Sequence, residues 1–187
     1  MADFNIIQKK VALSEGGYTC NKDDAGNWTG ASVGEGELVG TNHGIAAHTY
    51  AHYIGHTPTK QEMIDMPYSV ALIIYRNSYW TTMYGDFIKD NSVAWMIYDA
   101  LIQHWDQSFY WTREAIQAQH IKVEGADVVI RRAYFNGKII IALNSCNQEW
   151  VFDNIKQCRL KYYKKLNNPT MYEGWVNRMS LMRYGDV

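Results

Sequence analysis

The chain has 187 residues, of which 47% are hydrophobic and 20% are charged. This size and composition predict one folded domain, or one domain with a small appendage, and exclude a disordered chain, which would carry few apolar residues and a high net charge. The formal net charge of −1 gives no general attraction to nucleic acid, and the longest apolar runs, such as residues 70–75, are too short to span a bilayer.

The N-terminal residues lack the features of a cleaved secretory signal, because no apolar stretch of sufficient length follows Lys9 and Lys10. We therefore expect a chain that is made in the cytoplasm and that leaves it, if it acts outside, by another route. Cys20, Cys146 and Cys158 lack the close spacing of a metal site and are expected to be reduced and mostly buried.

The first expected element is an amphipathic helix over residues 4–14, which presents its apolar residues on one face. The pair Gly16-Gly17 ends it, because glycine readily adopts the left-handed backbone that follows a helix. Residues 16–44 contain eight of the 14 glycines. They therefore form a long loop or an irregular hairpin, and loops of this length usually carry function.

Hydrophobic periodicity and capping residues predict helices through most of the remaining chain. Residues 127–130 are the exception, because they are able to form a short strand. The expected helical segments are 46–55, a start at 57–62, 67–80, 93–105, 112–120, 138–144, 149–166 and 171–182. The sequence thus predicts a mainly α protein with one large glycine-rich insertion after its first helix.

Glu15 is the carboxylate with the clearest candidate role in catalysis. It follows the first expected helix, where the negative end of the helix dipole and apolar neighbours favour the protonated form. A carboxylic acid that stays protonated near neutral pH can act as the general acid of glycoside hydrolysis. The adjacent loop offers four candidates for a second carboxylate, namely Asp23, Asp24, Glu35 and Glu37. On the residues alone, a purely structural role for Glu15 at the helix end stays open.

His48 and His52 are four residues apart in an expected helix, a spacing at which two histidines can bind one metal ion, and His56 follows beyond it. Thr49 occupies the position where the metallohydrolase pattern places a glutamate. Packed or surface histidines are therefore favoured over a metal site. The basic segment Lys156–Lys165 is interpreted as a solvent-exposed helix face. The alternative is that it binds an anionic polymer.

Three blocks of this sequence closely resemble glycoside hydrolase family 108: Glu15-Gly16-Gly17-Tyr18, the segment Asp24–Gly30 and the segment Gly40–Ile45. Members of that family are lysozyme-like N-acetylmuramidases of phage and prophage lysis cassettes, such as endolysins, and proteins once called secretion activators. A looser similarity extends through Ala71–Trp80 to the C-terminal part, which is similar to a region described in the family as peptidoglycan-binding.

The resemblance implies a lysozyme-like helical fold with an irregular or β-hairpin loop after the first helix. It also implies two regions, a muramidase region over residues 1–120 and a helical peptidoglycan-binding region over residues 121–187, packed into one globular unit. The expected partner is the peptidoglycan glycan strand. No metal, cofactor, nucleic acid or stable membrane insertion is expected, and holin-type or other non-classical release would bring the chain to the bacterial cell wall.

The family uses the glutamate of its E-G-G-Y motif as the catalytic acid, which corresponds to Glu15. Two D-P pairs of the family are altered here, and only the acid of the second pair is kept, which makes Asp24 the candidate for the second acidic role. The expected residues for sugar stacking or hydrogen bonding are Tyr18, Trp28, Thr41 and Trp80.

The function expected from the resemblance is cleavage of the β-1,4 bond between N-acetylmuramic acid and N-acetylglucosamine, with Glu15 as the general acid. Two alternatives stay open. One is a wall-binding or secretion-assisting protein without turnover, and the other is a metal-dependent wall amidase or peptidase that uses His48 and His52.

Overall fold

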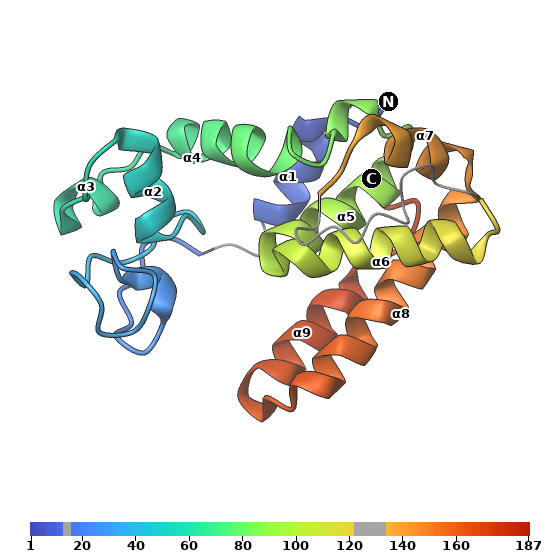
Figure 1. The fold of residues 1–187 in the computed structure, drawn as a ribbon. Helices are drawn as coiled ribbons and strands as arrows, with labels where there is room; N and C mark the ends of the chain where they lie inside the picture. Colours follow the sequence, from blue (N-terminus) through green and yellow to red (C-terminus); the bar gives the residue numbers. More distant parts are fainter. Residues whose placement is uncertain (13–15, 122–133) are drawn as a thin grey trace. The chain divides into compact units, whose positions relative to one another are not determined.

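The structure is a computed structural model that describes residues 1–12, 16–121 and 134–187, and it confirms the mainly helical fold (Figure 1). Backbone contacts divide the chain into two compact units. The N-terminal unit comprises Gln8–Asn77, and the C-terminal unit comprises Met1–Ile7 together with Ser78–Val187. Neither boundary falls at residue 120, so a separate region over residues 121–187 stays a prediction.

Short helices and one long loop build the N-terminal unit. The helices are α1 (Phe4–Ala12), which enters the unit at Gln8, α2 (Ala47–Ile54), α3 (Lys60–Ile64) and α4 (Tyr68–Ile74), and the loop contains the single-turn helix η1 (Ala25–Asn27). The predicted start at 57–62 is confirmed as a capping box, in which Thr59 and Glu62 satisfy each other's backbone N–H groups.

The glycine-rich segment forms the expected irregular hairpin. Isolated antiparallel bridges join Thr19 to Thr41 and Trp28 to Leu38. Gly40 has a φ of +95°, and a Cβ atom added there would lie 2.5 Å from the Tyr18 ring and 2.6 Å from the Thr19 carbonyl oxygen. The Tyr18 hydroxyl donates a 2.9 Å hydrogen bond to the carbonyl of Val39. Two of the sequence blocks, around Tyr18 and Gly40, are therefore in direct contact.

Gly40→Ala is expected to lower the free energy of unfolding by about 2 kcal/mol or more, because it adds both backbone strain and a clash with the Tyr18 ring. Gly34→Ala is the matched control, since Gly34 has a φ of +83° but nothing within 4 Å of an added Cβ. Comparing the thermal unfolding of the two variants separates the cost of backbone strain, which both share, from the cost of the clash with Tyr18, which only Gly40→Ala has. Equal losses would contradict the packing of Gly40 against Tyr18.

Longer helices build the C-terminal unit. After the π-helical segment η2 (Tyr75–Trp80), which crosses the boundary, come η3 (Gly85–Phe87), α5 (Asn91–Gln103), α6 (Trp105–Ala118), α7 (Gly137–Ser145), α8 (Gln148–Leu166) and α9 (Pro169–Leu181). Every residue of α5 from Ser92 to Leu101 is buried, as expected for a helix that is surrounded by other helices. Helices α6 and α8 pack against it.

The helices expected at 93–105 and 112–120 differ in the structure, because α5 ends at Gln103 and α6 already begins at Trp105. His104 separates them with φ −147° and ψ 66°. Its ring contacts Trp111 and Tyr162, with centroids 5.9 and 5.3 Å away. No glycine or proline marks the break between the two helices, so hydrophobic periodicity alone did not predict it. The strand expected at residues 127–130 lies outside the described residues.

His104 is expected to make the C-terminal unit sensitive to acid. Burial and, to a smaller extent, the charge of Arg159 lower the pKa of His104 to about 4, whereas Asp99 acts in the opposite direction. The unfolded chain takes up this proton near pH 6.5 and the folded chain does not, so stability is lost as the pH falls from about 6.5 towards 4. After discounting for solvent screening, the loss is about 1–2 kcal/mol. His104→Phe should flatten the pH dependence of thermal unfolding; an unchanged profile would assign the acid sensitivity to other groups.

Candidate functional site

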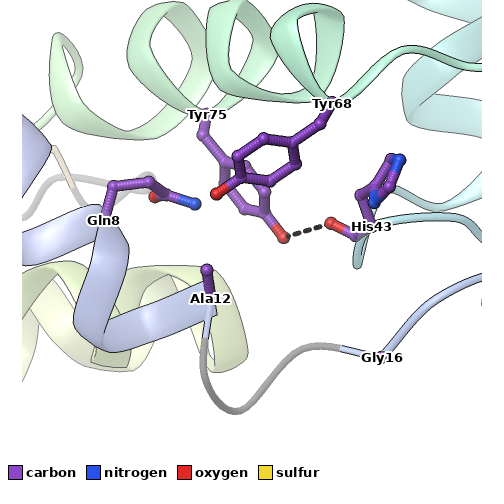
Figure 2. Close-up of a pocket in the computed structure, with 6 residues that line it drawn as sticks. All are labelled: Gln8, Ala12, Gly16, His43, Tyr68 and Tyr75. Carbon is purple, nitrogen blue, oxygen red and sulfur yellow. Dashed lines mark hydrogen bonds between the residues drawn. The ribbon is translucent and has the colours of Figure 1, made fainter.

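A cavity of about 90 Å³ lies within the N-terminal unit (Figure 2). Residues of α1, of the glycine-rich segment and of α4 with its extension line it: Gln8, Ala12, Gly16, His43, Tyr68 and Tyr75. Figure 2 shows Tyr68 and Tyr75 reaching down from the helix above the cavity, with the Gln8 side chain coming from α1. A whole small-molecule ligand typically needs about 300–1,000 Å³. The cavity is therefore smaller than the site of a whole small-molecule ligand.

A tight turn presents His43 to this cavity. Asn42 and Ile45 pair through hydrogen bonds of 2.8 and 3.2 Å, and the two residues between them, His43 and Gly44, have φ values of 50° and 74°. These four residues form a β-hairpin turn with a two-residue loop, of the kind in which both central residues have positive φ. The buried Asn42 amide donates to the carbonyl of Met63 at 2.8 Å, at the end of α3. The turn is thereby fixed to a neighbouring helix.

Two tyrosines of the α4 region hold the other side of this turn. The Tyr75 hydroxyl donates a 3.1 Å hydrogen bond to the His43 carbonyl. The His43 ring meets the Tyr68 ring edge to face, with centroids 5.3 Å apart. Tyr75 is buried and Tyr68 is exposed, so one ring supports the backbone while the other is accessible from solvent. The residues that line the cavity thus include two tyrosines and a glutamine, whose side chains carry groups that can hydrogen-bond to a polar ligand.

Glu15, the expected catalytic acid, lies outside the described residues. The described residues that flank this gap in the sequence, Ala12 and Gly16, both line the cavity. Gln8 and Ala12 also precede Glu15 at the spacing that repeats on one face of a helix. That spacing could have identified Gln8 as a cavity residue. The contributions of Tyr68 and Tyr75 carry no comparable sequence signal.

Asp24, the expected second acid, lies on the exposed surface of the glycine-rich loop. Its Oδ1 atom accepts a 2.9 Å hydrogen bond from the Gly26 N–H and caps η1. A Cβ added to Gly26 would lie 3.3 Å from this oxygen and 3.6 Å from Thr41 Oγ1. Asp24 and Thr41 therefore face the same glycine, and a side chain there would crowd both. Neither residue is among those that line the cavity.

Tyr18 and Trp28 are partly exposed in the same loop. The Trp28 indole donates a 2.8 Å hydrogen bond to the Lys22 carbonyl, and the Tyr18 hydroxyl is held by Val39. Burial, followed by a hydrogen bond and charge interaction with Cys20, raises the pKa of Tyr18 to about 12. Tyr18 therefore stays a neutral hydroxyl at neutral pH.

Trp80 lies in the core of the C-terminal unit and has no exposed surface. Its ring contacts Phe4 and Tyr98 edge to face at 5.5 and 5.6 Å, and its Nε1–H donates to Asp86 at 2.9 Å. A Cβ added to Gly85 would lie 2.3 Å from its ring. Sugar stacking requires an exposed ring face, which Trp80 lacks in this structure. Its described contacts are those of a packing residue.

The histidines considered for a metal site lie on the surface. His48 and His52 are exposed on α2, while His56 lies beyond its end and contacts Glu62 Oε1 at 3.0 Å. Among residues 1–12, 16–121 and 134–187, no group of three or more His, Cys, Asp or Glu residues is placed to hold a metal ion. Over the same residues, no helix has the length and hydropathy required to cross a membrane.

Comparisons with known proteins agree with these motifs. A family model described as Glycosyl hydrolase 108 matches residues 8–105, more than half of the chain. The structure of Brucella abortus SagA is similar in fold, with a TM-score of 0.73 and 22% sequence identity over 95% of this chain and 89% of that one. No curated protein matches the sequence.

Proposed function

Because the chain belongs to the glycosyl hydrolase 108 family, we propose that it is a peptidoglycan hydrolase that cleaves the β-1,4 bond between N-acetylmuramic acid and N-acetylglucosamine. The observation that carries the proposal is the cavity at the E-G-G-Y motif. Gly16 of that motif and His43 of the motif at residues 40–45 both line it. Two of the three blocks that carry the family resemblance thus contribute residues to one cavity.

In this proposal Glu15 is the general acid that protonates the glycosidic oxygen. It is supported by the position of Glu15 in the sequence, directly before Gly16 at the edge of the cavity. Protonation makes the leaving oxygen a better leaving group as positive charge develops on the sugar ring. A water molecule then attacks this oxocarbenium-like centre, and the Asp24 carboxylate accepts the proton that the water loses.

Asp24 is proposed to orient that water. Its Oδ1 atom already accepts the Gly26 N–H, and the exposed position of the side chain leaves the carboxylate accessible to solvent. Tyr18, Trp28 and Thr41 are proposed to contact the glycan, because they are partly exposed on the same loop. The neutral Tyr18 hydroxyl and the indole face of Trp28 suit hydrogen bonding and stacking on sugars.

The test is product analysis on purified peptidoglycan. The native chain should release new reducing ends, and borohydride reduction followed by acid hydrolysis should convert muramic acid, and not glucosamine, to its alcohol. The activity should persist in EDTA. Reduced glucosamine would identify a different glycosidase, and new free amino groups would identify an amidase or peptidase. A chain that pellets with the wall but releases nothing would be a binding protein.

Asp24→Asn is expected to reduce the rate of reducing-end release by about 10²-fold or more. The asparagine keeps an oxygen that accepts the Gly26 N–H but removes the charge, so the unfolding temperature should stay the same. Asp24→Ala removes the cap as well and should lower stability by about 1 kcal/mol. If Asp23→Asn abolishes turnover and Asp24→Asn does not, the second acidic role belongs to Asp23.

A further inference from the structure

The joined ends of α8 and α9 form a hairpin end, which we call the hairpin tip and define as residues 161–174. Every residue from 164 to 174 is exposed. In Figure 1, α8 and α9 run side by side, and their joined end lies away from α5 and α6. The buried Tyr163 ring, at the inner end of the tip, stacks on Trp175 with centroids 5.0 Å apart.

Contacts at the base hold this hairpin rigidly against the rest of the C-terminal unit. The carboxylate of Asp99 binds Arg159 of α8 at 2.6 Å and Arg178 of α9 at 2.8 Å. Lys156 Nζ donates a 2.6 Å hydrogen bond to the Met182 carbonyl. The tip is therefore presented by a fixed base.

Positive charge gathers on one face of the tip. Lys161, Lys164 and Lys165 are exposed and are spaced as neighbours on one side of α8. No acidic residue occurs between Asp153 and Glu173. The helix dipole favours lysines in the last turn of α8, but Lys161 lies one turn earlier, where the repulsion between like charges disfavours it. Helix stability alone does not explain this arrangement.

Apolar side chains are exposed beside these lysines. Leu166 is 41% exposed, Met171 50% and Tyr172 36%. They lie at the last residue of α8 and in the first turn of α9, on either side of the Asn167-Asn168 turn. The combination of lysines, aliphatic residues and a tyrosine is typical of a segment that contacts a membrane interface.

We propose that the hairpin tip docks the protein on an anionic phospholipid surface. The three lysines are attracted by the negative headgroups, and Leu166, Met171 and Tyr172 enter the boundary between headgroups and acyl chains. The apolar residues favour a lipid surface over a hydrophilic polyanion, which would bind the lysines alone. This docking is peripheral and is independent of the glycosidase activity.

The test is co-sedimentation of the full chain with vesicles of phosphatidylcholine, with and without phosphatidylglycerol. The chain should bind the anionic vesicles, should bind the neutral ones far less, and should dissociate at high salt. Combined Lys161→Gln, Lys164→Gln and Lys165→Gln should weaken binding about tenfold to a hundredfold. The matched control combines Lys9→Gln, Lys22→Gln and Lys60→Gln, which changes the net charge equally at exposed positions outside the tip and should retain binding.

A second variant separates a lipid from a polyanion. Met171→Ser with Tyr172→Ser should also weaken vesicle binding, while binding to dextran sulfate stays unchanged. Circular dichroism of each variant checks its folding. The proposal is overturned if the chain does not bind anionic vesicles or binds neutral vesicles equally well. It is also overturned if the control lysine variant loses as much vesicle binding as the lysine variant of the tip. None of these outcomes depends on muramidase activity, so a failure of the docking proposal can be distinguished from a failure of the proposed function.

Discussion

Glu15→Gln is expected to reduce the release of reducing ends from purified peptidoglycan by about 10²–10⁴-fold, the contribution of a positioned general acid. Glutamine has nearly the size and polarity of the protonated acid but cannot transfer a proton to the glycosidic oxygen. The measurement is the initial rate of release with the native chain and the variant at equal protein concentration.

Two controls make this result specific. Glu114→Gln changes an exposed carboxylate on α6 and should leave the rate unchanged. The Glu15→Gln chain should still sediment with peptidoglycan and should unfold at the native temperature, so that a lower rate reflects chemistry. If the variant keeps the native rate, Glu15 marks only the end of a helix and another residue supplies the acid.

Asp99→Asn is expected to lower the free energy of unfolding of the C-terminal unit by about 3–5 kcal/mol, the loss found when one member of a buried ion pair is removed. Asp99 and Arg159 are buried, and Arg178 closes the network from α9. Burial alone would raise the pKa of Asp99, but the charges and hydrogen bonds of Arg159 and Arg178 outweigh it and hold the pKa below its usual value. The amide would remove the carboxylate that binds the buried Arg159 at 2.6 Å.

Urea unfolding measured by circular dichroism checks this prediction. Asp153→Asn is the control, because Asp153 is exposed on α8, and it should change stability by less than about 0.5 kcal/mol. Adding Arg159→Met to Asp99→Asn should recover part of the loss, because it removes one unpaired charge. A loss below about 1 kcal/mol for Asp99→Asn would contradict the buried network.

The sequence was sufficient wherever the signal was local. The first helix, the capping box at Thr59 and Glu62, and the division between the last two helices at Asn167-Asn168 follow from periodicity and capping residues. The glycine-rich loop was identifiable because residues 16–44 hold eight of the 14 glycines, a composition that excludes a helix. The motifs at residues 15–18 and 40–45 carried the family, which the match over residues 8–105 confirmed.

Contacts between distant residues were not accessible from the sequence. Trp80 was expected beside a sugar, yet Phe4, Gly85 and Tyr98 enclose its ring in the C-terminal unit. An aromatic residue in a helix has the same local pattern whether it packs or binds, so only its neighbours distinguish the two. The ion pairs of Asp99 with Arg159 and Arg178 were inaccessible for the same reason, because they depend on which helices pack together.

The sequence by itself determined the helical class and the glycine-rich loop, because both depend on residue type and local spacing, and its resemblance to the family made Glu15 the catalytic candidate. Tertiary structure alone decided which residues surround the cavity. His43 reaches it because a turn with two positive φ values is fixed by Asn42 to the end of α3, and Tyr75 holds the His43 carbonyl from 32 residues away. Such positions depend on chain segments meeting in space, which local periodicity does not record.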